Sequence, residues 1–313
     1  MVGRRIVIAL GGNAILRHGQ AGTYSEQIAN IEAACDQVAG IAEMGYDIAL
    51  THGNGPQVGN ILDQNKIASA RIPPVPLDAC GAESQGLIGY VVQQCLMNSL
   101  RRKGIRRPVV TVVSQVIVPS NDAAFANPSK PIGGFLDELE ARRLSELERF
   151  AVNEEAGKGW RRVVASPLPM RIVEAAAIEG LMSEGCIPIA CGGGGIPVIE
   201  AADGDLRGVE AVIDKDLTAQ LLAREVKAEV LLILTDVDGV MLGFGTPRVR
   251  VVAEMSLDEA QDMLDRGEFA PGTMRPKMKA TIAFLRSGGR SVHIGNLTRA
   301  SDVLLGKAGT TVR

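Results

Sequence analysis

The chain has 313 residues and a formal net charge of -3, with 46% hydrophobic and 22% charged residues. This balance is ordinary for a globular protein, and a chain of this length can bury a large core without disulfides. The slight acidity argues against a nucleic-acid partner, which usually requires a basic domain, and no apolar run approaches the roughly 18 residues of a membrane span.

Short apolar runs recur along the chain and are followed by glycine-rich turns or by helical patterns. In chain order they cover residues 6–10, 47–51, 109–113, 187–191, 230–234 and 291–294. Runs that are apolar on both faces are typical of parallel strands covered by helices. Between them, apolar residues recur at helical spacing in 28–41, 87–96, 217–222 and, more loosely, 282–285. The alternation predicts an α/β fold.

One stretch, from Pro119 to Trp160, breaks this rhythm. A loop leads into a densely charged segment and then into a polar turn. Both signs of charge alternate in 137–149, so we interpret it as a solvated helix with i,i+4 pairs such as Glu138 with Arg142. Insertions of this length are often lids or binding loops, and we expect a small subdomain that protrudes from the main sheet.

The five cysteines are an odd number and contain no CxxC pair. In a chain of this size they favour reduced thiols in a cytoplasm. Since the three histidines are also scattered along the sequence, a zinc site is not expected.

Three glycine-rich turns follow predicted strands, at residues 11–13, 53–55 and 192–195. In a parallel sheet, such turns share the edge at which ligands bind. Glycine lets backbone N–H groups approach an anion, although any single turn has the simpler explanation of a tight bend. None of the turns fits GxxxxGK[ST], and none is a GxGxxG followed by an acid about 20 residues on, which disfavours a dinucleotide dehydrogenase.

Three lysines have unusual local contexts. Lys130 lies in a Pro- and Gly-rich loop, Lys215 lies between two acids at a helix start, and Lys277 follows a Gly-Thr-Met-Arg-Pro segment. Phosphoryl transfer needs fixed cations and Mg²⁺ more than it needs proton-transfer groups. A solvated surface charge is the alternative for each lysine, and for Lys215 a local ion pair.

Nine ordered segments, spread over almost the whole chain, are similar to carbamate kinases of the amino acid kinase family. They are ALGGNA (9–14), THGNGPQVG (51–59), GAESQGLIGY (81–90), PSKPIG (128–133), RRVVASPLP (161–169), GGGGIPV (192–198), GVEAVIDKDL (208–217), LTDVDGV (234–240) and GTMRPKMKA (272–280). Relatives that phosphorylate other acids typically carry a lysine just before the first glycine pair. Here Ala9 and Leu10 stand there, and Lys130 looks like the substitute.

The resemblance implies one domain over 1–313, a three-layer αβα sandwich with a mainly parallel central sheet, and a lid-like subdomain at 117–162. It implies reversible phosphoryl transfer between ATP and carbamate, in the direction of ATP formation and within arginine metabolism. It also implies Mg²⁺ held by the nucleotide phosphates, a cytoplasmic location and a homodimer. The helix at 86–100, with Leu87, Val91 and Val92, is a candidate dimer interface, although its periodicity fits an ordinary core face equally well.

The resemblance also implies a catalytic set. Lys130 would descend from the subdomain onto the acceptor, and Lys215 and Lys277 would flank the transferred phosphoryl group. Asp216 would orient these lysines and lie near the metal, with no direct protein ligand to it. Carbamate is already an anion, so a general base is not required.

Backbone-rich segments would hold the substrates. On the acceptor and phosphate side the implied residues are Gly11, Gly12, Asn13, Gly53, Asn54 and Gly55. On the nucleotide side they are Lys215, Thr235, Asp236, Val237, Gly272, Thr273, Met274 and Lys277.

The sequence departs from the family pattern at three places. PIGGF (131–135) stands where PIGPF is usual, and Asp122-Ala123-Ala124-Phe125 stands in place of DPAF. Met241 and Gly243 replace an aromatic residue and an asparagine on the adenine side. These changes favour one alternative, a kinase of the same fold with another small carboxylate substrate. A ligand sensor without turnover is the other alternative, although the intact set of Lys130, Lys215, Asp216 and Lys277 argues against it.

Overall fold

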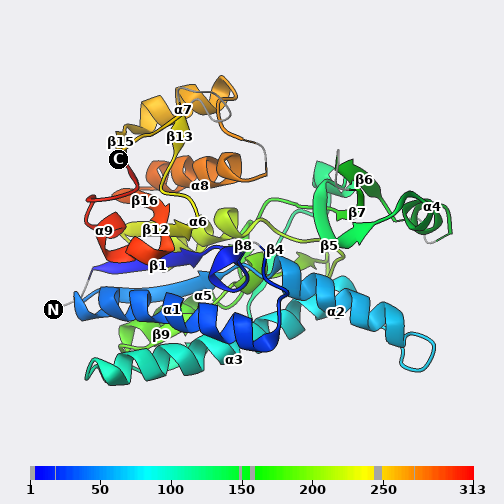
Figure 1. Cartoon of the computed structure of the whole chain (residues 1–313), viewed down its shortest axis with the longest axis horizontal. Coiled ribbons are helices and arrows are strands. Elements are labelled where there is room, and N and C mark those ends of the chain that lie inside the picture. Colours follow the sequence, from blue (N-terminus) through cyan, green and yellow to red (C-terminus); the bar gives the residue numbers. More distant parts are fainter. Residues whose placement is uncertain (1–3, 18, 148–149, 156–158, 243–248, 271) are drawn as a thin grey trace.

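The computed structural model describes residues 4–17, 19–147, 150–155, 159–242, 249–270 and 272–313. Its centre is an eight-stranded sheet in the order β15-β17-β16-β12-β1-β2-β9-β3 (Figure 1). Every ladder in it is parallel except β16 with β17. The strands are β1 (Arg5–Leu10), β2 (Asp47–His52), β3 (Val109–Thr111), β9 (Ile187–Ile189), β12 (Val230–Thr235), β15 (Glu254–Met255), β16 (Ser291–Asn296) and β17 (Thr310–Val312).

Each of the six predicted apolar runs forms a strand of this sheet. In β1, Ile6 and Ile8 point into one hydrophobic core while Val7 points into the other, and all three side chains are fully buried. A strand buried on both faces has no polar side, which is why these strands are continuous apolar runs. The predicted α/β class and its mainly parallel sheet are confirmed.

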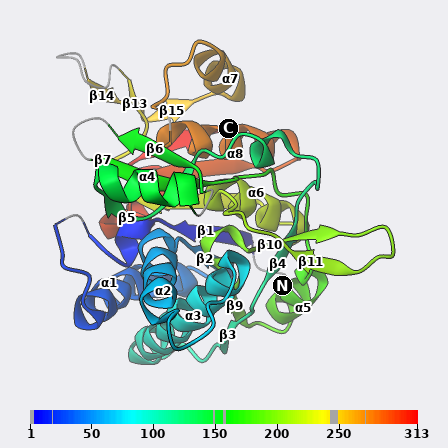
Figure 2. The ribbon, with the colours of Figure 1, turned by 90° about the vertical axis from the view of Figure 1, so that its right-hand side faces the viewer.

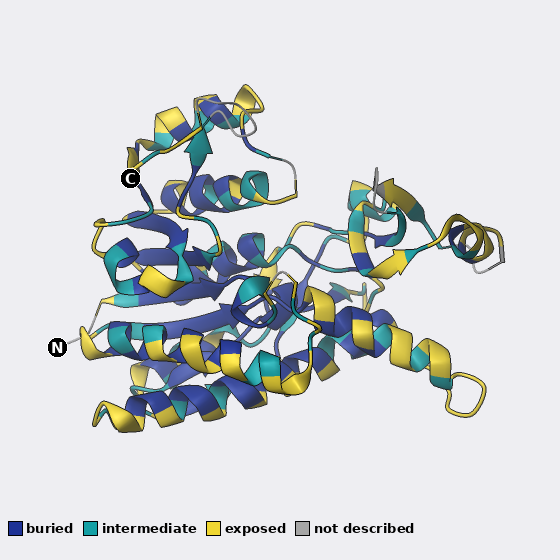
Figure 3. Ribbon diagram, viewed as in Figure 1, coloured by how far each residue is buried: buried dark blue, intermediate teal, exposed yellow. Residues whose placement is uncertain are grey.

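Helices cover both faces of the sheet and make three layers (Figure 1). One core lies under α1 (Tyr24–Glu43), α3 (Leu77–Arg102) and α9 (Ala300–Leu304). The other lies under α5 (Ala175–Ser183), α6 (Lys215–Glu225), α7 (Leu257–Asp265) and α8 (Met274–Arg286). In Figure 3 the buried residues follow the sheet and the helix sides that face it.

The helix α3 begins at Leu77, well before the predicted segment 86–100. Val91 and Val92 are 4% and 0% exposed and pack in the core under this helix. They are therefore unavailable to a partner chain, and their assignment to a dimer interface was wrong. Leu87 and Tyr90, at 44% and 54% exposed, are the side chains of this turn that face outward.

The insertion contains a three-stranded antiparallel sheet in the order β5-β7-β6. Its elements are β5 (Lys130–Leu136), α4 (Glu138–Leu147), β6 (Val152–Glu155) and β7 (Gly159–Val164). They stand apart from the main sheet and lie beside α2 (Gly55–Ala68), as the two views agree (Figures 1 and 2). The predicted ion pair in α4 is confirmed, since Arg142 Nη2 lies 2.6 Å from Glu138 Oε1.

A four-stranded sheet, which the sequence did not predict, adjoins the insertion. Its order is β11 (Leu206–Gly208), β10 (Ile196–Glu200), β4 (Gln115–Ile117) and β8 (Arg171–Ile172). The chain leaves the main body through β4 and returns through β8, so this sheet carries the insertion at its base. A short hairpin, β13 (Met241–Leu242) with β14 (Arg250–Val251), lies on the same side of the main sheet as α7 (Figures 1 and 2). Within the described parts of the chain, every helix is too short or too polar to cross a bilayer.

Candidate active site

A cavity of about 390 Å³ opens where β1 and β12 end. Five segments line it: the 3₁₀ turn η1 (Gly12–Ala14) with the residue before it, the end of β12 with the loop that follows, Met241 of β13, the start of α6, and the chain that leads into and begins α8. The lining includes all the residues predicted for the nucleotide and three of those predicted for the acceptor and phosphates. They are Gly11, Gly12, Asn13, Lys215, Thr235, Asp236, Val237, Gly272, Thr273, Met274 and Lys277.

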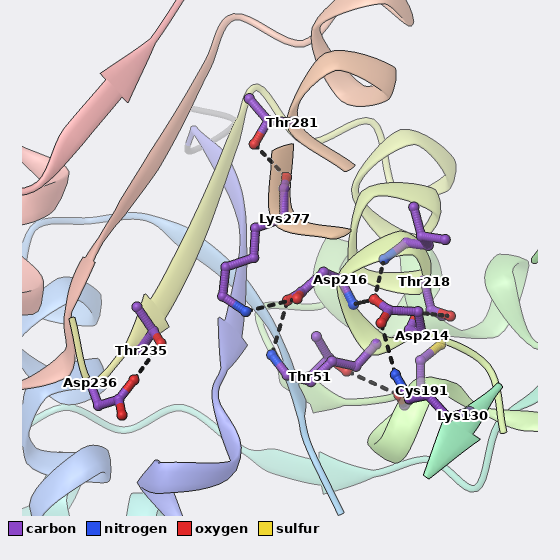
Figure 4. Close-up of polar contacts among 12 residues, drawn as sticks. Thr51, Lys130, Cys191, Asp214, Asp216, Thr218, Thr235, Asp236, Lys277 and Thr281 are labelled. Atoms are coloured by element: carbon purple, nitrogen blue, oxygen red, sulfur yellow. Dashed lines mark hydrogen bonds and ion pairs between the residues drawn. The ribbon is translucent and has the colours of Figure 1, made fainter. Parts of the chain in front are cut away.

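Asp216 pairs with two of the predicted lysines, both of which line this cavity. Figure 4 shows its contact with one of them, Lys277. Its Oδ1 lies 2.9 Å from Lys215 Nζ, and its Oδ2 lies 2.9 Å from Lys277 Nζ. The Asp216 side chain is 4% exposed, so the ion pairs are shielded from water. One carboxylate thus fixes two ammonium groups beside a space that can hold an anion.

The surroundings of Asp216 and Lys215 shift the pKa of these two groups. Burial alone would raise the pKa of Asp216, but the charges and hydrogen bonds of Lys215 and Lys277 outweigh it and hold that pKa well below its ordinary value. Burial lowers the pKa of Lys215, and the nearby Asp216 partly opposes this effect. The carboxylate is therefore ionised throughout the physiological range, and it offers a fixed negative charge that keeps two cations in place.

The start of α6 sets the direction of these side chains. Asp214 is the N-cap of the helix, and its Oδ1 accepts from the backbone N–H of Asp216 at 3.0 Å and of Leu217 at 3.4 Å. Aspartate is among the favoured residues at this position because it satisfies N–H groups that have no partner within the helix. The cap fixes the turn that carries Lys215 and Asp216.

Lys130 reaches the same turn from the insertion. It is the first residue of β5, and its Nζ lies 2.9 Å from Asp214 Oδ2 (Figure 4). The ammonium group is thus next to the start of α6, although it does not line the cavity described above. All three predicted lysines converge on residues 214 and 216.

The predicted acceptor loop at the end of β2 lies against this cluster. A Cβ atom added at Gly53 would be 3.3 Å from the backbone N of Gly12 and 3.3 Å from Lys215 Cδ, so a side chain would not fit easily. Gly53 N donates to Leu10 O at 3.1 Å and continues the sheet ladder. The N–H of Gly55, at the first position of α2, belongs to the N-terminal set of that helix that lacks intrahelical acceptors.

Asn54 is 7% exposed, and its Nδ2 donates to Ser84 Oγ on α3 at 2.7 Å. The glycine turn at 192–195 lies directly behind it. A Cβ atom at Gly193 would be 2.1 Å from Asn54 Nδ2, and one at Gly194 would be 2.3 Å from Ile213 O. Gly192 to Gly194 are buried and do not line the cavity, so this turn supports the acceptor loop and the 213–216 segment from behind.

The departures from the family pattern fall in different surroundings. Met241 lines the cavity, whereas Gly243 lies outside the described residues. Gly133 has a φ of +68° and is followed by Gly134 in place of the usual proline. The register of β5 with β7 is irregular between Ile132 and Leu136.

Two relationships of the site were not predicted from the sequence. The first is the role of Asp214 as the N-cap of α6, although an acid directly before a helix is a recognisable capping signal. Gly59 on α2 faces Gly133 on β5, and a Cβ atom at Gly59 would lie 2.9 Å from Gly133 Cα. The sequence contains no sign of that contact.

The residues present suit a metal ion that is carried by the nucleotide. Among the described residues, no group of three or more His, Cys, Asp or Glu side chains is placed to hold a metal. Both carboxylate oxygens of Asp216 already accept from ammonium groups. Mg²⁺ prefers phosphate oxygens and water with one or two carboxylates, so this donor set fits a metal bound mainly through phosphates.

Comparison with known proteins gives a consistent result. Residues 4–296 match the model of the amino acid kinase family. The chain is 47% identical over 313 residues to the carbamate kinase of Pyrococcus furiosus, with 99% of each chain covered. It is 49% identical over 312 residues to the carbamate kinase of Thermococcus kodakarensis, again with 99% of each covered.

A solved structure agrees with these relatives. The carbamate kinase from Giardia lamblia bound to AMP-PNP superposes with a TM-score of 0.93 at 41% identity, over 99% of this chain and 98% of that chain. Both the sequence and the architecture are thus shared over the full length. The chain therefore belongs to the amino acid kinase family and, within it, to the carbamate kinases.

Proposed function

We propose that this chain catalyses reversible phosphoryl transfer between ATP and carbamate, with ADP and carbamoyl phosphate as the other pair. The observation that carries the proposal is Asp216 with Lys215 and Lys277 at 2.9 Å each, beside the cavity. A phosphoryl group in transfer carries dispersed negative charge, and fixed cations stabilise it without reorganisation. In this proposal the γ-phosphoryl group lies between the two ammonium groups.

The nucleotide would occupy the 390 Å³ cavity. Thr235, Asp236 and Val237 would border it after β12, and the segment 272–274 would close over its phosphates at the start of α8. Gly11, Gly12 and Asn13 would form the phosphate path. This assignment is supported by the position of all three residues in the cavity wall.

The acceptor would lie at the N-terminus of α2, where backbone N–H groups and the helix dipole favour an anion. Because Gly53 N is engaged in the sheet, Asn54 and Gly55 are the backbone donors we expect to hold carbamate. Carbamate has few atoms to recognise, and a backbone pocket suits it. Lys130 would approach from the insertion, and residues 117–162 would together act as a lid over the acceptor.

Mg²⁺ would travel with ATP or ADP and neutralise phosphate charge. Asp216 would remain near the metal and direct the lysines. No proton transfer by a side chain is needed, since the attacking carbamate oxygen is anionic. The steps left to the protein are positioning, charge stabilisation and exclusion of water.

The proposal extends to the setting of the enzyme. We infer a homodimer in the cytoplasm that forms ATP from carbamoyl phosphate within arginine metabolism. The outward-facing Leu87 and Tyr90 on α3 support a protein interface there, because exposed apolar side chains that cluster are typical of such surfaces.

ATP formation from ADP, Mg²⁺ and carbamoyl phosphate tests the function directly. We expect rapid turnover by the wild type, a large loss in Lys215→Ala, and a loss in Lys130→Ala with unchanged ADP binding. A folded wild type that forms no ATP would refute the proposal. Turnover with another small acyl phosphate would then indicate a different acceptor, and nucleotide binding without turnover would indicate a sensor.

A further inference from the structure

We propose that Asp214 is a positioning residue that ties the insertion to the catalytic turn of α6 and thereby places Lys130 on the acceptor. Its kinetic consequence rests on the function proposed above. Asp214 does not line the nucleotide cavity, and its two carboxylate oxygens serve two different elements. Their separate roles allow the two to be tested independently.

One oxygen belongs to the helix. Asp214 Oδ1 accepts from Asp216 N at 3.0 Å and from Leu217 N at 3.4 Å. These bonds hold the first turn of α6, from which Lys215 and Asp216 project. Any residue that supplies a short acceptor at the N-cap can perform this role.

The other oxygen belongs to the insertion. Asp214 Oδ2 lies 2.9 Å from the Nζ of Lys130, which is 84 residues away in the sequence. The Asp214 side chain is 14% exposed and the Lys130 side chain is 32% exposed, so this pair is partly shielded from water. Charge-assisted bonds of this kind are stronger than neutral ones and fix the distance between two elements.

The order of charges explains why such a residue is needed. From the insertion to α8, the site alternates in sign: Lys130, Asp214, Lys215, Asp216 and Lys277. Three ammonium groups close together repel, and each has a carboxylate oxygen at 2.9 Å in this arrangement. Asp216 holds the two cations on the nucleotide side, and Asp214 holds the cation on the acceptor side.

Two substitutions separate the roles of the oxygens. Asp214→Asn and Asp214→Ser both keep a good N-cap acceptor, but an amide NH₂ or a short hydroxyl cannot pair with Lys130. We expect both variants to raise the KM for carbamoyl phosphate about tenfold, which corresponds to the loss of one charge-assisted hydrogen bond. Both should also lower kcat. The KM for ADP should stay within about twofold of wild type, since ADP lies on the Asp216 side.

The matched control removes a helix cap far from the acceptor. Ser256 is the N-cap of α7 and accepts from Glu259 N at 3.2 Å. Ser256→Ala should lower the Tm by about 2 °C and leave the KM for carbamoyl phosphate unchanged. Asp214→Asn should instead raise the KM for carbamoyl phosphate and leave the Tm unchanged.

A double variant tests whether Asp214 acts through Lys130. In the Lys130→Ala background, Asp214→Asn should cause no further rise in KM, because the partner that it positions is gone. Wild-type kinetics in both Asp214→Asn and Asp214→Ser would overturn the proposal. So would an effect of Asp214→Asn that is equally large with and without Lys130.

Hydrogen exchange measured by mass spectrometry gives a readout that does not require turnover. In Asp214→Asn the amides of β5 should exchange several-fold faster, while those of α6 keep their wild-type protection because the cap remains. Unchanged exchange in β5 would overturn the proposal whether or not the enzyme is active. An inactive wild type whose β5 responds in this way would refute the proposed reaction and leave the positioning role of Asp214 supported.

Discussion

The ammonium nitrogen of Lys277, on α8, lies 2.9 Å from Asp216 Oδ2 at the start of α6. The two residues are 61 positions apart, so this bond joins two helices that pack on the same face of the sheet. Since the other oxygen of Asp216 pairs with Lys215, a change at Asp216 releases both cations together.

Asp216→Asn should therefore disable the enzyme more severely than loss of one hydrogen bond. Two neighbouring ammonium groups would share an uncharged amide, and we expect kcat to fall at least about 100-fold. Breaking a buried ion pair should also lower the free energy of unfolding by about 3 kcal/mol. Steady-state kinetics and urea denaturation measure these two effects.

Glu179→Gln is the matched control for that variant. Glu179 on α5 also bridges two cations, Arg5 and Lys227, at 3.0 Å each, but it lies outside the cavity. Its substitution should leave kcat and both KM values unchanged. Equal kinetic losses in the two variants would contradict a specific role for Asp216.

The stability of the fold should decrease as the pH falls below 6.5. Burial lowers the pKa of His52 from 6.5 to about 4, and the charge of Lys215 adds to this effect. In the unfolded chain His52 binds a proton near pH 6.5, while in the folded protein it stays neutral down to about pH 4. Its contribution to stability is thus complete above pH 6.5 and declines by about 3 kcal/mol as the pH falls to 4.

Urea denaturation at several pH values between 7 and 4 measures this slope. His293 should add a similar decline, because burial also lowers its pKa to about 4. His52→Asn keeps a donor near Gly53 O without a titrating group, so it should remove about half of the slope. A slope identical to that of wild type would argue against a neutral, buried His52.

Gly59→Ala should separate the insertion from α2. The new Cβ atom would lie 2.9 Å from Gly133 Cα and 3.1 Å from Gly133 N, and backbone atoms cannot yield as a flexible side chain can. We expect kcat/KM for carbamoyl phosphate to fall about tenfold, since Lys130 begins the same strand and small displacements are costly. Gly81→Ala, in helix α3 with open space around the Cβ position, is the control and should keep wild-type kinetics. Normal kinetics in Gly59→Ala would show that the insertion tolerates displacement.

Leu87→Asp combined with Tyr90→Asp should convert the inferred dimer to a monomer. These side chains are 44% and 54% exposed, and a charge buried in an interface without a partner is unfavourable. Light scattering should give twice the chain mass of 33.0 kDa for wild type and 33.0 kDa for the variant. Ile67→Asp, at an 83% exposed position on α2, should remain dimeric. A monomeric wild type would contradict the inference.

Much of the fold was predictable from the sequence because parallel strands buried on both faces leave a distinct pattern. β1 and β12 are continuous apolar runs for this reason. β8 and β15 have two residues each, and such lengths leave no periodic signal. The antiparallel pairing of β17 with β16 was likewise not predictable, because it depends on which strand edge the rest of the sheet leaves unpaired.

The site also has features that the sequence predicts and features that it does not. The three lysines and Asp216 stand in local segments with clear resemblance to a family, and the structure brings them together. The pairing of Lys130 with Asp214 joins residues 84 apart, and the contact of Gly59 with Gly133 is between backbone atoms. Such relationships depend on how the insertion sits on the main body, which no local pattern encodes.

The position of β1 at the centre of the sheet has a consequence for synthesis of the chain. Ile6 pairs with Ile48 on one side and with Val230 on the other. At 5–20 residues per second, a ribosome takes roughly 10–45 s to advance from β1 to β12, the neighbour of β1 that is made last. During that interval one edge of the first strand lacks its native partner, and an open apolar edge invites pairing with other chains. We therefore expect chains truncated before residue 230, which lack β12, to aggregate.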